Sequence, residues 1–262
     1  MIATLRYEFL MQIRRPSLWI VYGLVFALLL ITMPFWSLDM GLPLEGGTAR
    51  QDMTTAAMIL ITLLPVVYGC MLADRPGRDR LLHVDGVLDA TPTSGTARLL
   101  GKWAGVCLAT AVPFAIAYFG RAVLWAVTEG DPAALGWAVV TFLAMIVPGL
   151  LFLGALAFAG SLVMPSIMFR VVFVAYWFWG NLIPPNTMPT LAHTIFSATG
   201  DYVRWGLLHP LPSGMVAYGE ATLDVLRPAH SPATAWLWIA VMIALAAVLL
   251  SVVRLHALRR ES

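Results

Sequence analysis

Residues 132–169 read PAALGWAVVTFLAMIVPGLLFLGALAFAGSLVMPSIMF and contain no Asp, Glu, Lys or Arg. A helix crosses the hydrocarbon layer of a membrane in about 20 residues, because each residue rises about 1.5 Å through a layer about 30 Å thick. This run is therefore too long for one crossing. We place one span near residues 135–156, and we expect the rest to reach a turn at Met164-Pro165-Ser166, where the next span begins.

Five further uncharged runs are long enough to cross a membrane or nearly so, and they occupy residues 16–38, 53–73, 103–120, 171–200 and 228–253. Only 11% of the residues are charged and the mean hydropathy is +0.83, whereas an ordinary soluble domain has about 25% charged residues. The sequence thus predicts an all-α integral membrane protein, with residues 1–262 as one transmembrane domain. Six transmembrane helices are expected near residues 18–36, 54–73, 103–127, 135–156, 167–184 and 235–253.

The basic residues predict the orientation, because Lys and Arg gather on the cytoplasmic side of membrane proteins. With six spans, 12 of the 16 basic residues fall on the side of the two termini, and 8 of the 14 acidic residues fall on the other side. The net charges are then 12 − 6 = +6 and 4 − 8 = −4. We therefore expect a multi-pass protein of the cell membrane with both termini cytoplasmic, in contact with membrane lipid and not with nucleic acid.

Residues 1–16 are expected to form an amphipathic helix that lies in the membrane interface. Ile2, Leu5, Phe9 and Ile13 share one helical stripe immediately before the first span. The alternative is a short solvated leader. The position of these residues directly before the first predicted span favours the interfacial helix.

Residues 74–102 form the longest charged stretch on the cytoplasmic side. Leu81, Val84 and Leu88 recur at helical spacing, and Thr91-Pro92 then stops the helix, because proline disfavours the α conformation of the preceding residue. Ser94 is placed to cap the next helix. The apolar stripe predicts either docking of a partner protein or a connector whose leucines pack under the bundle.

Residues 185–234 form an outer loop in which prolines separate short pieces. Residues 190–198 are almost apolar but too short to span, so we expect a re-entrant or interfacial helix there.

Motifs for catalysis are absent from the sequence. The nearest match to a phosphate-binding loop has five residues between Gly95 and Gly101 instead of four, and Trp103 stands where the hydroxyl residue is needed. The histidines do not form a metal motif such as H-E-x-x-H. We therefore do not expect the chain to be an ATPase or another enzyme by itself, and we expect no cofactor or metal in it.

Three residues are candidates for a substrate path. Arg121 lies in an apolar stretch, where a charge at mid-bilayer costs about 2.5–3.5 kcal/mol on insertion scales. It is expected to reach the headgroups or pair with Glu129 or Asp131, or else to line a substrate path. Trp177 and Asn181, late in the fifth span, are typical of the interface belt and are further candidates for the path.

The sequence DGVLDATPTS at residues 85–94, followed by Leu99-Leu100-Gly101-Lys102, resembles the cytoplasmic loop of ABC-2 type permeases, the transmembrane subunits of ABC exporters. That family typically has a leucine-rich helix, a Thr-Pro or Leu-Pro turn, a Ser, and Gly-Lys entering the third span. The amphipathic start, the six-span plan and the long outer segment extend the resemblance over nearly the whole chain. Gly95 departs from it, since the family often carries Arg there.

The resemblance implies a coupling helix over residues 80–94 that docks on a separate ABC ATP-binding subunit, which would bind the ATP and Mg. The residues expected to dock are Leu81, Val84, Asp85, Gly86, Leu88, Asp89 and Pro92. A second permease subunit, in a homo- or heterodimer, is also implied. The competing interpretations are a non-transporting membrane scaffold or assembly factor, and, more weakly, an intramembrane enzyme.

Overall fold

The computed structural model describes residues 1–32, 48–74, 94–209 and 224–261, and every regular element in these ranges is a helix. The elements follow the chain as α1 (Ile2–Ile13), α2 (Pro16–Thr32), α3 (Ala49–Leu63), α4 (Pro65–Leu72), α7 (Gly95–Thr128), α8 (Ala133–Thr141), η2 (Phe142–Ile146), α9 (Val147–Val163), α10 (Ser166–Trp177), η3 (Phe178–Leu182), α11 (Asp201–Val203), η4 (Arg204–Leu208), η5 (Asp224–Leu226) and α12 (Pro232–Glu261). The prediction of an all-α protein is confirmed for this part of the chain.

Three helices among the described residues are long and apolar enough to cross a membrane: Gly95–Thr128, Ala133–Val163 and Pro232–His256. A fourth crossing results if Ala49–Leu63 and Pro65–Leu72, which meet at an angle of 44°, form one broken span. Two shorter apolar helices, Pro16–Ala27 and Ser166–Leu182, occupy the places of the predicted first and fifth spans. The described part of the chain therefore has three or four helices of spanning length, where the sequence predicted six spans in the whole chain.

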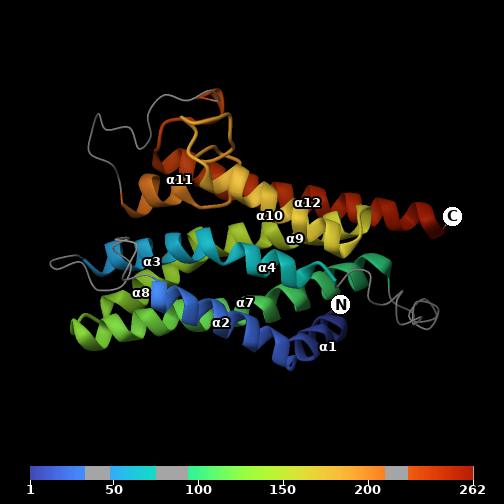
Figure 1. The fold of residues 1–262 in the computed structure, drawn as a ribbon, viewed down its shortest axis with the longest axis horizontal. Coiled ribbons are helices and arrows are strands. Elements are labelled where there is room, and N and C mark those ends of the chain that lie inside the picture. Colours follow the sequence, from blue (N-terminus) through green and yellow to red (C-terminus); the bar gives the residue numbers. More distant parts are fainter. Residues whose placement is uncertain (33–47, 75–93, 210–223, 262) are drawn as a thin grey trace.

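The long helices lie roughly along one direction, and both chain termini are at the same end of the bundle (Figure 1). The most extensive pairings join α1 to α7, α9 to α12 and α3 to α8. Large apolar side chains remain exposed along the outer helices, for example Val123 and Leu124 on α7 and Trp236 and Ile243 on α12. Such apolar surfaces are typical of a membrane contact.

Several helix boundaries follow directly from local sequence. Ser94 caps α7 as predicted, since its side chain accepts a hydrogen bond from the amide of Ala97 at 3.2 Å. The predicted turn at Met164-Pro165-Ser166 is also confirmed, because α9 ends at Val163 and α10 begins at Ser166.

At residue 65, proline has no amide hydrogen to continue the helix, and the break between α3 and α4 falls there. In addition, α7 begins inside the predicted loop 74–102, so that residues 95–102 belong to the helix.

The predicted helix at residues 190–198 is wrong. This segment contains no helix but a series of turns, several of whose side chains are buried. Thr190, Thr194 and Ser197 hydrogen-bond to nearby groups of the chain. Hydroxyl side chains that bond locally compete with the helical backbone pattern, which accounts for the difference.

Residues 2–13 are helical as predicted; the most buried side chains of α1 are polar, whereas Leu5, Phe9 and Ile13 of the apolar stripe are half-buried. Glu8 and Gln12 are the buried side chains of α1, and Gln12 donates to Thr110 of α7 at 3.2 Å. Ile2, at the start of the stripe, is exposed. The two helices approach through Gly101 and Gly105 of α7: a Cβ at Gly105 would lie 2.5 Å from the carbonyl oxygen of Leu5. Small residues at helix contacts allow this close backbone approach.

We predict that Gly105→Val displaces α1 from α7 and lowers the stability by about 1–3 kcal/mol, because the new methyl groups meet backbone atoms that cannot move aside. Thermal unfolding of the protein in mild detergent, with protease cleavage of residues 1–15 as a second readout, measures the effect. Gly120→Val is the matched control on the same helix, since a Cβ at Gly120 meets no atom within 4 Å. Equal behaviour of the two variants would contradict the assignment.

Candidate apolar cavity and its polar surroundings

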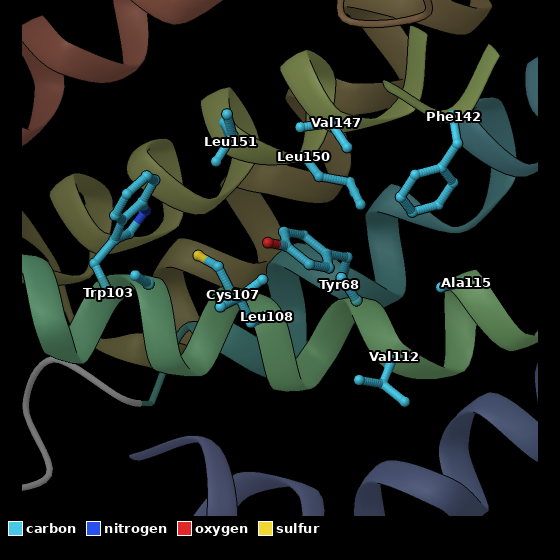
Figure 2. Close-up of a pocket in the computed structure, with 12 residues that line it drawn as sticks. Tyr68, Trp103, Cys107, Leu108, Val112, Ala115, Phe142, Val147, Leu150 and Leu151 are labelled. Atoms are coloured by element: carbon cyan, nitrogen blue, oxygen red, sulfur yellow. The ribbon is translucent and has the colours of Figure 1, made fainter. Parts of the chain in front are cut away.

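A cavity of about 370 Å³ lies between α4, α7 and the η2–α9 segment (Figure 2). Its walls are carbon-rich, with α7 on one side, α9 on the other and Tyr68 of α4 behind them. The residues that line it are Tyr68, Trp103, Ala104, Cys107, Leu108, Ala111, Val112, Ala115, Phe142, Val147, Leu150 and Leu151. Among the residues that the structure describes, no charged side chain lines this cavity. It fits the size range of ligand pockets, which are mostly apolar.

The polar atoms of the lining residues converge on one point at Gly154 of α9. A Cβ built there would lie 3.3 Å from both Trp103 Nε1 and Tyr68 Oη, and it would overlap Cys107 Sγ. Only glycine leaves room for these three side chains to come together against α9. Their polar atoms are thereby held against the helix backbone at Gly154 and away from the open volume of the cavity.

Aromatic side chains pack together at the end of the cavity that lies away from Trp103. Phe142 lines the cavity, and its ring lies 5.1 Å from that of Phe119 and 5.8 Å from that of Tyr118. Tyr118 in turn donates its hydroxyl hydrogen to the carbonyl of Met53 in α3 at 3.1 Å. This end of the cavity is therefore linked to α3 near the start of that helix.

Arg121 forms an ion pair with Asp52 at this same end of the bundle. Its Nη2 and Nε donate to the two carboxylate oxygens at 2.6 and 3.1 Å, and the side chains are 24% and 7% exposed. From the sequence, Arg121 was expected to reach the headgroups, to pair with Glu129 or Asp131, or to line a substrate path. The predicted acidic partner is wrong, because the partner is Asp52. Asp131 instead accepts from the amide of Ala133 at the start of α8. Two-point bonding of a guanidinium by a carboxylate is the strong form of such a pair.

Trp177 and Asn181, the other candidates for a substrate path, are buried and do not line this cavity. Trp177 donates its indole hydrogen to the carbonyl of Thr62 in α3 at 2.8 Å. Asn181 accepts from the hydroxyl of Ser197 at 3.0 Å and from the amide of Ala198 at 3.1 Å. In the structure, both residues tie the α10–η3 segment to its neighbours.

The segment between η3 and α11 contains a hydrogen-bonded polar cluster that the sequence did not predict. Nδ1 of His193 lies 2.8 Å from Asp201 Oδ2, and the hydroxyl of Thr199 donates to the same oxygen at 2.9 Å. His193 adopts a left-handed backbone conformation with φ of 61°. Burial raises the pKa of Asp201, but the hydrogen bond and charge of His193, the hydrogen bond of Thr199 and the charge of Arg204 outweigh it, so that the net pKa is lowered. The acidic partner of His193 was not predicted from the sequence.

At the opposite end of the bundle, side-chain contacts join the helix ends that flank residues 75–93. Arg170 of α10 forms an ion pair with Asp74 and donates to the carbonyl of Cys70 at 3.2 Å. Arg254 of α12 donates to the hydroxyl of Thr96 in α7 at 3.1 Å. The predicted docking residues Leu81, Val84, Asp85, Gly86, Leu88, Asp89 and Pro92 lie outside the described residues.

Comparison of the chain with protein-family models, with curated proteins and with solved structures finds no match. Among the described residues, no group of three or more His, Cys, Asp or Glu side chains is arranged to hold a metal ion.

We predict that Arg121→Met destabilises the protein by about 2–4 kcal/mol, because it leaves the buried Asp52 carboxylate without its cation. The free energy of unfolding in detergent measures this. Adding Asp52→Asn to the same variant is expected to restore part of the loss, since the uncompensated charge is then gone.

The control for this experiment is Asp224→Asn, which removes a carboxylate that is 56% exposed from its pair with Arg227 and is expected to cost less than about 1 kcal/mol. A loss for Arg121→Met no larger than for the control would contradict a structural role of the Arg121–Asp52 pair.

We predict an acid-dependent contribution of Asp201 to stability. Since its pKa is lowered in the folded protein, the ionised carboxylate stabilises the fold fully above the ordinary value of 3.8. This stabilisation is lost as the pH falls through the lower folded pKa. The difference in unfolding temperature between the natural protein and Asp201→Asn, measured from about pH 6 downward, is therefore expected to shrink only below about pH 4. A difference that already vanishes near neutral pH would contradict the assignment.

Proposed function

We propose that the chain is the membrane-spanning permease subunit of an ATP-driven ABC exporter, coupled to a separate ATP-binding subunit. One structural observation supports this proposal in addition to the resemblance of residues 85–102 to the cytoplasmic loop of ABC-2 type permeases. Both helix ends that flank residues 75–93 are tied to other helices, Asp74 to Arg170 of α10 and Thr96 to Arg254 of α12. A displacement of residues 80–94 by a docked ATPase would therefore act on α10 and α12 as well as on α4 and α7.

The proposal includes six crossings near the residues predicted from the sequence, with α2 and the α10–η3 segment as the two shorter ones. It also includes cytoplasmic termini in the cell membrane. Support for this orientation comes from basic residues near helix ends: Arg98 and Lys102 near the start of α7, Arg170 near the start of α10 and Arg254 near the end of α12. Both chain termini lie at the end of the bundle where α7 begins and α12 ends (Figure 1).

In the proposed mechanism, two permease subunits pair and each rests on one ATPase, which holds the ATP and Mg. Closure of the ATPase pair moves the coupling helices, and the two bundles change their relative tilt so that access alternates between the two sides. ATP drives the change because the ATPases contact the permease differently in the two states. Arg121, Trp177 and Asn181 would then act by fixing helices relative to one another, as their contacts to Asp52, Thr62 and Ser197 suggest.

We predict that Leu88→Asp abolishes copurification of the ATPase while the protein still inserts into the membrane, because a charge on the apolar stripe opposes docking. The tagged chain is purified from its host in mild detergent, and partners are identified by mass spectrometry. Val225→Asp is the control: Val225 is 97% exposed and lies on the segment before α12, in the predicted outer loop.

Normal copurification of an ATPase with Leu88→Asp would refute the coupling-helix assignment. Reproducible absence of any ATPase from the natural protein, with other proteins present instead, would favour a membrane scaffold or assembly factor.

A further inference from the structure

The cavity between α4, α7 and α9 is too large to be an ordinary packing defect. Protein interiors are close-packed, with few voids larger than a water molecule. An engineered apolar cavity of about 150 Å³ already binds benzene or xenon. The cavity here has a volume of about 370 Å³. The cavity is also partly open to the surface of the bundle, so a molecule from outside can enter it.

The chemistry of the walls restricts the occupant to a hydrocarbon. The described residues that line the cavity include no charged side chain, and the polar atoms of Tyr68, Trp103 and Cys107 meet at Gly154 instead of pointing into the volume. A buried water needs 2–4 polar partners, roughly three on average, and these walls do not offer them. Water and polar ligands are therefore disfavoured.

The shape and position of the cavity favour a linear chain that comes from the membrane. Its lining on α7 extends from Trp103 to Ala115, which corresponds to about 18 Å along the helix at 1.5 Å per residue. Along this side Ala104, Ala111 and Ala115 leave a smooth wall. Leu108 lines the cavity and is also 53% exposed on the outer surface of α7, a helix of membrane-spanning length. The cavity wall thus continues into the lipid-facing surface.

We propose that this cavity is a binding site for one acyl chain of a bilayer phospholipid. The chain lies along α7 between Trp103 and Phe142, with α4 behind it and α9 opposite (Figure 2). This site does not depend on an ATPase partner, so it goes beyond the proposed transport function and can be tested on the chain alone.

The experiment uses the purified full chain in phosphatidylcholine vesicles that contain a phosphatidylcholine with a photoreactive diazirine in one acyl chain. After illumination, mass spectrometry maps the labelled residues. Tyr68 and Leu150 decide the result, because they line the cavity but are only 1% and 5% exposed, so that bulk lipid around the bundle does not reach them. We expect label on both. A phosphatidylcholine with the diazirine in its headgroup is expected to label neither.

A cavity-filling variant supplies the second comparison. Ala111→Trp places an indole in the volume and is expected to abolish the label on Tyr68 and Leu150. Gly120→Trp adds the same side chain to α7 where a Cβ meets no atom within 4 Å, and is expected to keep the label. The unfolding temperature of both variants shows that they are folded.

Three results would overturn the proposal: absence of acyl-chain label from Tyr68 and Leu150 in the natural protein, equal labelling in Ala111→Trp, or labelling by a free photoreactive alkane but not by the lipid. The headgroup comparison needs no variant, so it stands even if Ala111→Trp does not fold. Failure of ATPase copurification would leave the acyl-chain result unaffected.

Discussion

Close contact along α7 is the constraint on which the rest of this bundle depends. Inside a membrane, burial of apolar surface does little to drive helices together, because lipid tails are as apolar as the side chains. Helix association then relies on dense packing, small residues and hydrogen bonds. α7 contacts α1, α2, α3, α4, α8, α9 and α12. Its glycines Gly101 and Gly105 bring α1 onto it, and Gly154 of α9 admits Cys107 of α7.

Polar groups fix the two ends of this arrangement. The Arg121–Asp52 pair joins α7 to α3 at one end, and the contacts of Arg170 and Arg254 join α10 to α4 and α12 to α7 at the other. Between them, Thr110 of α7 accepts a hydrogen bond from Gln12 of α1. Since an unpaired charge in hydrocarbon is costly, ion pairs at the helix ends set the relative positions of helices with less penalty than pairs at mid-bilayer would.

The sequence predicted the features that depend on local chemistry. The cap at Ser94, the turn at Pro165 and the helical form of residues 2–13 are confirmed, because each depends on residues within one or two turns. The Arg121–Asp52 pair was missed because the two residues are 69 positions apart in the sequence. The acidic residues closer in sequence, Glu129 and Asp131, were expected to be the partners instead.

The buried polar side chains of α1 were not predicted from the sequence, for a related reason. An apolar stripe indicates which face avoids water, but in a membrane protein that face can meet lipid while polar side chains such as Gln12 pack against a neighbouring helix. The cavity could not be predicted either, since it arises where several helices meet and leave space, and no single stretch of sequence encodes it.

The break between α3 and α4 lies where α10 contacts both helices, and these contacts affect how α4 can move. A proline break in a spanning helix frees backbone groups that must find partners elsewhere. Trp177 of α10 donates to the carbonyl of Thr62, in the turn just before Pro65. Nearer the other end of α10, Phe173 packs directly on Gly69, and Arg170 bonds to the carbonyl of Cys70 and to Asp74.

α10 therefore follows α4 over its whole length, from the break to the residue before segment 75–93. The two helices are expected to move as one body, with the 44° break at Leu64–Pro65 as the place where that motion can be absorbed. Tyr68, one turn beyond the break, also forms the back wall of the apolar cavity. A tilt of the α4–α10 pair would consequently change the width of the cavity, and an occupant of the cavity would resist that tilt.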